Sequence, residues 1–281
     1  MEHIKSFLDT GLATEGQLLI VRKIFDTLIP EVDKALIPRS EAAIYAGPGE
    51  VPGSSLDVDL ETPNTLDVRE IAEGSEIFLD QQAYTSFNIK PKKYGVAIRI
   101  TNEMLEDGKW NLLQRNVMTA GKRMAENENS LIISDALDNA DTTVSGGAAI
   151  TISNITTAMF NLEQDDYEPT TLFVGNEVAQ DLRNIDTFVE ADKFGNREML
   201  QSGFIGNIFG MNVIRVSTNA GMTATTAYVT DKRWAYVIVE KRALSMENFD
   251  LPTFDMSGAV VTHRLGVRHL RAEAIAKITT S

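Results

Sequence analysis

The stretches Leu56-Asp-Val-Asp-Leu-Glu61 and Tyr94-Gly-Val-Ala-Ile-Arg-Ile-Thr101 alternate strictly between apolar residues and residues that are charged, polar or small. A period of two is typical of β-strands with one face in water and the other face buried. Together the two segments carry too little apolar surface for a core, and a two-stranded ribbon alone is marginally stable in water. We therefore predict that the apolar face of this ribbon packs on another surface, and that a second copy of the chain provides it.

The composition is that of a folded protein with a sizeable core. The chain has 281 residues, of which 43% are hydrophobic and 23% are charged, and its mean hydropathy is −0.12. No apolar run approaches the roughly 20 residues of a membrane span, and the N-terminal residues lack the basic start and apolar middle of a secretion signal. We expect a cytoplasmic protein without membrane association. The absence of cysteine excludes disulfides, thiolate zinc sites and cysteine nucleophiles.

The charge is acidic and unevenly distributed along the chain. The 40 acidic and 26 basic side chains give a net charge of −14, whereas proteins that grip a nucleic-acid backbone usually show a basic face. Residues 50–80 hold nine carboxylates and a single cation, Arg69, while residues 262–271 hold three arginines, two histidines and no acid. We predict that these oppositely charged segments meet, either within one subunit or between subunits.

Periodicity predicts both helices and strands, and hence an α+β fold. Apolar spacings of three and four predict helical structure over residues 18–36, interrupted at Pro30, and a longer helix from about Glu106 to Asp138. The longer helix would measure roughly 45–50 Å and needs a large surface to lie on. For the rest of the chain we predict helices near Ile155–Glu163 and Asn176–Ile185, strands at Thr171–Val174, Tyr228–Val229 and Trp234–Glu240, a strand that ends near Ser217, and a strand-rich segment over Ala259–Ile278.

The sequence contains no recognisable metal-binding or cofactor-binding motif. His3, His263 and His269 are scattered, and no third ligand lies at a helpful spacing, so partly exposed strand residues describe the last two better than a metal site does. The three glycines between residues 203 and 210 lack the spacing of a dinucleotide-binding turn and favour close packing before a strand. We predict no metal site, no cofactor site and no catalytic residue.

Three carboxylates in one strand give the alternative from another class of protein. Asp57, Asp59 and Glu61 line one strand face, and such residues can bind a cation or act as acid and base. That chemistry needs a concave, partly desolvated place, whereas a projecting arm offers the opposite. A solvated strand face is therefore the favoured interpretation, and an acidic cytoplasmic enzyme that uses these carboxylates is kept as an alternative.

Four features follow one another along the chain: a helical N-terminal arm, a long extended loop, the run Val96-Ala-Ile-Arg-Ile-Thr-Asn-Glu-Met-Leu-Glu-Asp107, and a long helix. Later comes Gly206-Asn-Ile-Phe-Gly-Met-Asn-Val-Ile-Arg-Val-Ser217. This order resembles the major capsid proteins of tailed double-stranded DNA phages, the Hong Kong 97-type fold. The resemblance implies an N-terminal arm at residues 1–53, an extended loop at 54–89, a peripheral domain at 90–140 and 236–281 with a spine helix at about 106–138, and an axial domain at 141–235.

The resemblance also implies a structural protein rather than an enzyme. Such subunits form hexamers and pentamers that close an icosahedral virion shell around double-stranded DNA, without sequence-specific binding, and they assemble in the host cytoplasm with a portal and, in some cases, a decoration protein. Because only residues 1–53 precede the loop, we expect a separate scaffolding protein. Because no lysine occurs between Lys34 and Lys90, we expect a shell without isopeptide bonds. An encapsulin-type nanocompartment, which has the same fold and stores protein cargo, is the first alternative.

In this family the extended loop reaches over the peripheral domain of a neighbouring subunit. From the charges of this chain we add the hypothesis that the acidic loop docks near the basic C-terminal strand of an adjacent subunit. The alternatives for the basic strand are a solvated edge or contact with packaged DNA. The candidate contact residues are Asp57, Asp59, Glu61, Arg69, Glu70 and Glu73 on the loop, and Arg264, Arg268 and Arg271 on the strand.

Overall fold

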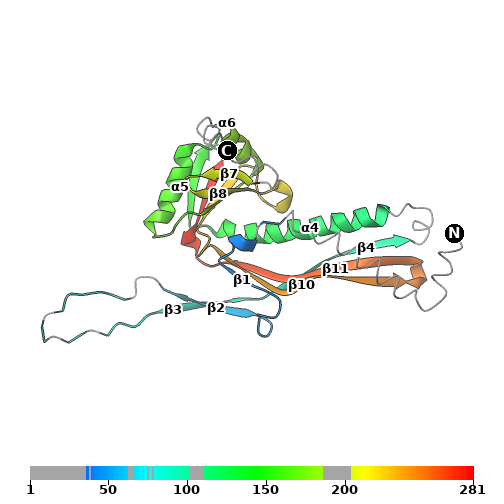
Figure 1. The fold of residues 1–281 in the computed structure, drawn as a ribbon, viewed down its shortest axis with the longest axis horizontal. Coiled ribbons are helices and arrows are strands. Elements are labelled where there is room, and N and C mark those ends of the chain that lie inside the picture. Colours follow the sequence, from blue (N-terminus) through cyan, green and yellow to red (C-terminus); the bar gives the residue numbers. More distant parts are fainter. Residues whose placement is uncertain are drawn as a thin grey trace.

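The structure is a computed structural model in which an upper body and an elongated lower sheet are joined side by side, with a two-stranded loop projecting from their junction (Figure 1). It describes residues 36–101 except 38, 63–65, 72, 75 and 78, and then residues 111–185 and 204–281. The predicted helical segment before Leu36 and the beginning of the predicted long helix lie outside the described residues.

The upper body is a six-stranded sheet of mixed direction with helices α5 (Ile152–Gln164) and α6 (Asn176–Asn184) packed on it. The predicted helices and the strand at Thr171–Val174 are confirmed. This strand is buried at all four positions, as expected for a strand that reads as one apolar run. In sheet order the strands are β5 (Thr142–Gly147), β12 (Ile275–Thr280), β9 (Thr226–Thr230), β6 (Thr171–Val174), β8 (Met211–Arg215) and β7 (Phe204–Ile208).

The elongated sheet has four strands, and helix α4 (Asn111–Asp135) lies along one of its faces (Figure 1). Alternate residues of β4, namely Tyr94, Val96 and Ile98, pack with Val117 and Met124 of α4. The predicted alternation in this strand is therefore confirmed, and its apolar face is covered by a helix of the same chain. In sheet order the strands are β1 (Ile44–Ala46), β10 (Tyr236–Leu251), β11 (Met256–His269) and β4 (Lys92–Thr101).

The third sheet is the extended loop, formed by β2 (Leu56–Glu61) and β3 (Tyr84–Ile89). The sequence paired residues 56–61 with residues 94–101, which was wrong, because β2 pairs with β3 while β4 pairs with β11. The signal for β3 is weak, since Tyr-Thr-Ser-Phe-Asn-Ile alternates poorly. The alternation in β2 itself is confirmed, because its apolar residues are half-buried and its acidic residues are exposed.

The described part of α4 has 25 residues, or about 37 Å, and ends at Asp135 instead of the predicted Asp138. A short 3-10 helix (Leu137–Asn139) then leads into the six-stranded sheet. None of the helices in the described ranges is long and apolar enough to span a membrane. The remaining 3-10 helices are Arg39–Glu41, Thr218–Ala220, Pro252–Phe254 and Ala272–Ala274.

Two parts of the C-terminal region differ from expectation. Strand β10 runs from Tyr236 to Leu251, well beyond the predicted Glu240, and its register shifts twice, between Glu240 and Arg242 and between Arg242 and Ser245. Strand β12 lies in the six-stranded sheet, so residues 236–281, which the resemblance assigns to the peripheral domain, contribute strands to both sheets. The chain crosses between the two sheets after His269, through the 3-10 helix Ala272–Ala274.

Candidate assembly surfaces

The base of the extended loop is fixed to the body of its own chain. Leu56, Val58 and Leu60 of β2 face an apolar cluster that includes Val237 and Val239 of β10. This cluster partly covers the inner face of the ribbon, which the sequence assigned to a second copy of the chain. The structure therefore corrects that prediction for the base of the loop. The apolar surface that still lacks a cover lies at the tip of the loop.

Gly266 of β11 lets the connection between β3 and β4 cross the elongated sheet. Built at this position, a Cβ atom would lie 3.1 Å from Ile89 Cγ2 and 3.3 Å from Pro91 Cα. Both distances are shorter than ordinary van der Waals contact, so the close approach depends on the missing side chain. Gly266 also pairs with Val239, which places it directly beneath the base of the loop. We call the surface of the elongated sheet on which the loop rests, formed by Val237, Val239 and Gly266, the seat of the loop.

We expect Gly266→Val to lift the loop from its seat. Overpacking of this kind costs about 1–3 kcal/mol, and protease cleavage within residues 50–91 should accelerate, because the chain there would detach more often. Urea unfolding and limited proteolysis of the unassembled subunit measure the two effects. Ala97→Val is the matched control, since Ala97 is exposed on β4 and should change the free energy of unfolding by less than about 0.5 kcal/mol. Equal cleavage rates in the two variants would contradict the role of Gly266.

Two arginines near the end of β11 contact the base of their own loop: Arg268 within the strand and Arg271 just after it. Arg271 Nη2 donates to the carbonyl of Glu61 at 2.7 Å, and Arg268 Nη1 lies 3.5 Å from the carbonyl of Asn88. Arg268 also stacks on Phe87, with 4.8 Å from its guanidinium carbon to the ring centroid. The basic and acidic segments therefore meet within one subunit, but through backbone carbonyls. Among the described residues, no carboxylate of the loop forms an ion pair with these arginines.

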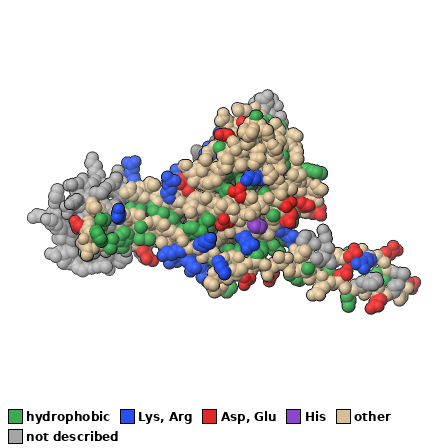
Figure 2. All heavy atoms as spheres, turned by 180° about the vertical axis from the view of Figure 1, so that it is seen from behind, with side chains coloured by type: hydrophobic (Ala, Val, Ile, Leu, Met, Phe, Trp, Pro, Cys, Tyr) green, Lys and Arg blue, Asp and Glu red, His purple; other side chains and the backbone are tan. Residues whose placement is uncertain are grey.

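The tip of the loop, by which we mean the described residues between 66 and 84, projects away from the body (Figure 1) and exposes apolar side chains. Val68 is 98% exposed and Leu79 is 99% exposed. Figure 2 shows acidic side chains gathered on this projection. Arg69 Nε pairs with Asp67 at 2.7 Å, so the cation of the tip is already engaged. The tip thus combines carboxylates with apolar groups that solvate poorly, and this combination is typical of a surface that binds a partner. Among the described residues of the tip, the other exposed large apolar side chains are those of Leu66, Ile71, Ile77 and Tyr84.

Three cations lie side by side on the face of the elongated sheet opposite α4. Lys93 of β4 pairs with Arg264 of β11, and Arg264 pairs with Arg242 of β10. We call Lys93, Arg264 and Arg242 the basic row, and Figure 2 shows basic side chains gathered along this part of the sheet. Like charges directly opposite each other on neighbouring strands are destabilising. None of the three forms an ion pair with a carboxylate of the described residues, so the row is suited to an acidic partner.

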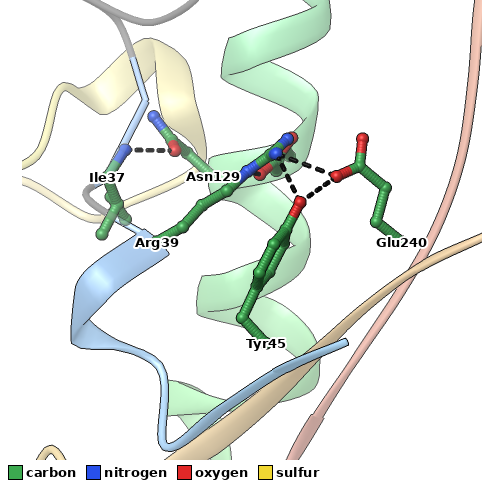
Figure 3. A network of polar contacts seen from close by, with 6 residues as sticks. Ile37, Arg39, Tyr45, Asn129 and Glu240 are labelled. Atoms are coloured by element: carbon green, nitrogen blue, oxygen red, sulfur yellow. Dashed lines mark hydrogen bonds and ion pairs between the residues drawn. The ribbon is translucent and has the colours of Figure 1, made fainter. Parts of the chain in front are cut away.

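A polar network fastens the segment before β1 to the body (Figure 3). Arg39 binds Glu128 of α4 through two bonds, Nε–Oε1 at 3.0 Å and Nη2–Oε2 at 3.1 Å, and its Nη1 lies 2.9 Å from Glu240 Oε2 of β10. Tyr45 donates its hydroxyl to the same oxygen of Glu240. Burial and this bond to Glu240 raise the pKa of Tyr45 to about 12, which keeps the phenol protonated as a donor.

His263 lies in the core between α4 and the elongated sheet, contrary to the expected partly exposed position. It is only 4% exposed, its ring packs edge-on against Tyr94 with centroids 5.7 Å apart, and its Nε2 has no hydrogen-bond partner among the described residues. Burial lowers the pKa of His263 to about 4, because a charged imidazole would lack solvation there.

Stability of the subunit should therefore fall as the pH drops below the ordinary histidine value of 6.5. Between pH 6.5 and pH 4 the unfolded chain binds a proton at His263 that the folded chain excludes, so the loss from this group reaches about 2 kcal/mol at pH 5 and levels off below pH 4. Urea unfolding of wild type and His263→Gln at pH 5 and pH 8 measures the difference. Glutamine does not titrate, so the variant should lose about 2 kcal/mol less over this range. An identical pH dependence of the two proteins would refute the assignment.

The other predicted residues do not converge on a chemical site. Asp57, Asp59 and Glu61 lie on the exposed face of β2, and Asn88 donates to Asp57 across the ribbon. Among the described residues no group of three His, Asp or Glu side chains is arranged to hold a metal ion. Sequence reasoning missed Lys93, Arg242 and Arg39. Lys93 carries a readable signal, since it belongs to the outward set of the alternating β4 strand, whereas Arg242 and Arg39 depend on long-range register and contacts.

Comparison with known proteins identifies the family of the chain and solved structures of the same fold. The sequence model of a family described as phage capsid protein matches residues 84–278. Similar solved structures include a chain of Mycobacterium phage Bobi, with a TM-score of 0.63, 14% identity, and coverage of 89% of this chain and 90% of that one. Another is in the asymmetric unit of the mature capsid of bacteriophage PhiM1, with a TM-score of 0.63, 10% identity, and coverage of 88% and 87%. A chain of Microbacterium phage Oxtober96 has a TM-score of 0.62, 14% identity, and coverage of 86% and 91%. No curated protein matches the chain significantly.

Proposed function

The chain belongs to the phage capsid protein family and has the Hong Kong 97-type fold of tailed-phage major capsid proteins, and from this premise we propose how its subunits build a shell. Hexamers and pentamers of the chain close an icosahedral virion capsid around double-stranded DNA. A portal and a separate scaffolding protein take part in assembly in the host cytoplasm. The proposed peripheral part is the elongated sheet with α4, and the proposed axial part is the six-stranded sheet with α5 and α6.

The full exposure of Val68 and Leu79 on the loop tip is the observation that carries this proposal. Two large aliphatic side chains held in water lose about 1.5–3 kcal/mol each relative to a buried state. The tip projects from its own body (Figure 1), so we infer that another copy of the chain covers these side chains. A closed assembly supplies such a copy to every subunit.

The basic row is the proposed landing site for the tip of a neighbouring subunit. Lys93, Arg264 and Arg242 offer three adjacent positive charges that carry no ion pair within the described residues of their own chain. Charge complementarity of this kind fixes register and orientation more than it adds affinity. Of the residues that the sequence suggested, Arg264 keeps its proposed intersubunit role, as do Glu70 and Glu73. We now assign Arg268 and Arg271 to the seat of their own loop.

The contacts of the proposed shell are non-covalent, since residues 35–89 contain no lysine for a bond from the loop. Many weak and repeated interfaces then hold the shell together, because each subunit is engaged by several neighbours at once. High salt screens charged contacts between subunits, so we expect it to dissociate the shell into intact chains.

Electron microscopy and size-exclusion chromatography of the expressed chain test the proposal. We expect shells that elute in the void volume and appear as closed particles, and in phage lysate such particles should contain DNA. A stable small oligomer at all concentrations would contradict the proposed function. Shells filled with a single protein cargo would instead indicate an encapsulin-type compartment. Denaturing gel electrophoresis of the shells should show single chains and no ladder of covalently linked subunits, in agreement with non-covalent contacts.

A further inference from the structure

A short segment near the start of the described chain touches every major part of the subunit. We call residues 37 and 39–46 the strap. Ile37 donates its backbone N–H to Asn129 of α4 at 2.9 Å, and Ala43 donates to the carbonyl of Tyr236 at 2.8 Å. Strand β1 within the strap extends the elongated sheet by parallel pairing with β10. The strap is therefore bound to both the helix and the sheet.

The strap also reaches the six-stranded sheet. Glu41 of the strap accepts a hydrogen bond of 2.5 Å from the hydroxyl of Thr171 at the beginning of β6. Ile37 and Ala42 belong to the apolar cluster that also holds Phe173 of the six-stranded sheet and Leu265 of the elongated sheet. The junction of the two bodies is thus covered by non-covalent contacts of one segment.

The charge at this junction is unbalanced without the strap. Glu128 of α4 is 2% exposed and Glu240 of β10 is 5% exposed, and both contact the same guanidinium of Arg39 (Figure 3). Neither carboxylate pairs with another Lys or Arg of the described residues. Burial alone would lower the pKa of Arg39, but the hydrogen bond to Glu128 and the charges of Glu128 and Glu240 raise it. The guanidinium therefore stays charged between the two carboxylates.

We infer that the strap holds α4 against the elongated sheet by placing the cation of Arg39 between two buried carboxylates, one on each element. Without Arg39, Glu128 and Glu240 would face each other as unpaired like charges in a poorly solvated place, where repulsion is strong. The strap thereby converts a repulsive contact into an attractive one. Arg39 acts as a positioning residue for the junction, and the strap that carries it determines how closely α4 and β10 approach.

A distance measurement within the unassembled subunit tests this inference independently of whether shells form. The chain has no cysteine, so cysteines introduced at Thr119 of α4 and Glu247 of β10, both exposed, can be spin-labelled without background. Pulsed electron paramagnetic resonance then reports the separation of the two elements. We expect a narrow distribution in the otherwise unchanged chain, and a longer and broader distribution in Arg39→Met.

Neutralising the two acids separates charge from packing. In Arg39→Met combined with Glu128→Gln and Glu240→Gln the repulsion is absent, so the original distance should return. Arg39→Lys keeps the charge and should keep the short distance as well. Arg123→Met is the matched control, because it removes a partly buried ion pair of 2.8 Å with Glu126 on the same helix. Lys122 still lies 4.0 Å from that carboxylate, so the variant should change nothing.

Two results would overturn the inference. One is an unchanged distance distribution in Arg39→Met, and the other is a triple variant that remains as open as the single one. If Arg39→Met does not fold, the triple variant decides alone. Its folding with the original distance supports the role of the strap, and its failure to fold refutes it.

Discussion

Subunits with Lys93→Glu and Arg264→Glu should fold normally and fail to form shells. The two changes reverse most of the basic row, which would then repel the acidic loop tip of the neighbouring subunit. At a partly desolvated contact we expect a cost of about 2 kcal/mol for each interface, or roughly thirtyfold in its association constant. In the proposed shell every subunit makes this contact, so the losses multiply and assembly should be undetectable at concentrations where the wild-type chain assembles fully.

Sedimentation and electron microscopy measure the assembly, and circular dichroism with urea unfolding measures the fold of the subunit. Lys93 is exposed and Arg264 makes one long hydrogen bond, of 3.4 Å, to the carbonyl of Pro91, so the free energy of unfolding should change by less than about 1 kcal/mol. Reversing two loop charges in the same chain, Glu70→Lys and Glu73→Lys, should restore shells. Normal shells from the variant with Lys93→Glu and Arg264→Glu alone would refute the docking of the loop tip on the basic row.

The second large effect is expected at the loop tip. Val68→Asp with Leu79→Asp should abolish assembly and leave the stability of the isolated subunit unchanged. Both side chains are almost fully exposed in the single chain, so nothing is lost there on substitution. In an assembled contact the two side chains together contribute roughly 4 kcal/mol, or about a thousandfold in the association constant of each interface.

The decisive comparison is between stability and assembly in the same samples. Urea unfolding should give the same midpoint for wild type and the double variant, while light scattering shows shells only for wild type. Glu76→Asp is a control on the tip that keeps its charge, and this variant should assemble. Assembly of the double aspartate variant at wild-type concentrations would show that the tip stays in water.

The strands of this protein could largely be predicted from its sequence, but their pairing could not. The alternation in residues 56–61 and 94–101 indicated two half-buried strands correctly. Their partners are β3, whose sequence alternates poorly, and β11, which lies more than a hundred residues away along the chain. Period and polarity are local properties, whereas the choice of partner depends on register across the whole fold.

The candidate surfaces show the same limit. The opposite charges of residues 50–80 and 262–271 correctly indicated that the two segments meet, yet Arg268 and Arg271 bind backbone carbonyls at the loop base rather than carboxylates. Arg242 joins the basic row only because β10 changes register on either side of it. Arg39 binds residues that are 89 and 201 positions away in sequence, and no local sequence pattern predicts such a contact.

The seat beneath the extended loop has a consequence for the thermodynamics of assembly. Because β2 and β3 are anchored at Gly266 and Val239 before any partner arrives, the loop is preorganised at its root. A preorganised arm loses less conformational entropy on binding than a free chain of equal length, so more of each contact energy remains as affinity. In the proposed shell a small tip can therefore hold a neighbouring subunit, and a single substitution at Gly266 under the base of the loop would weaken that contact at a distance.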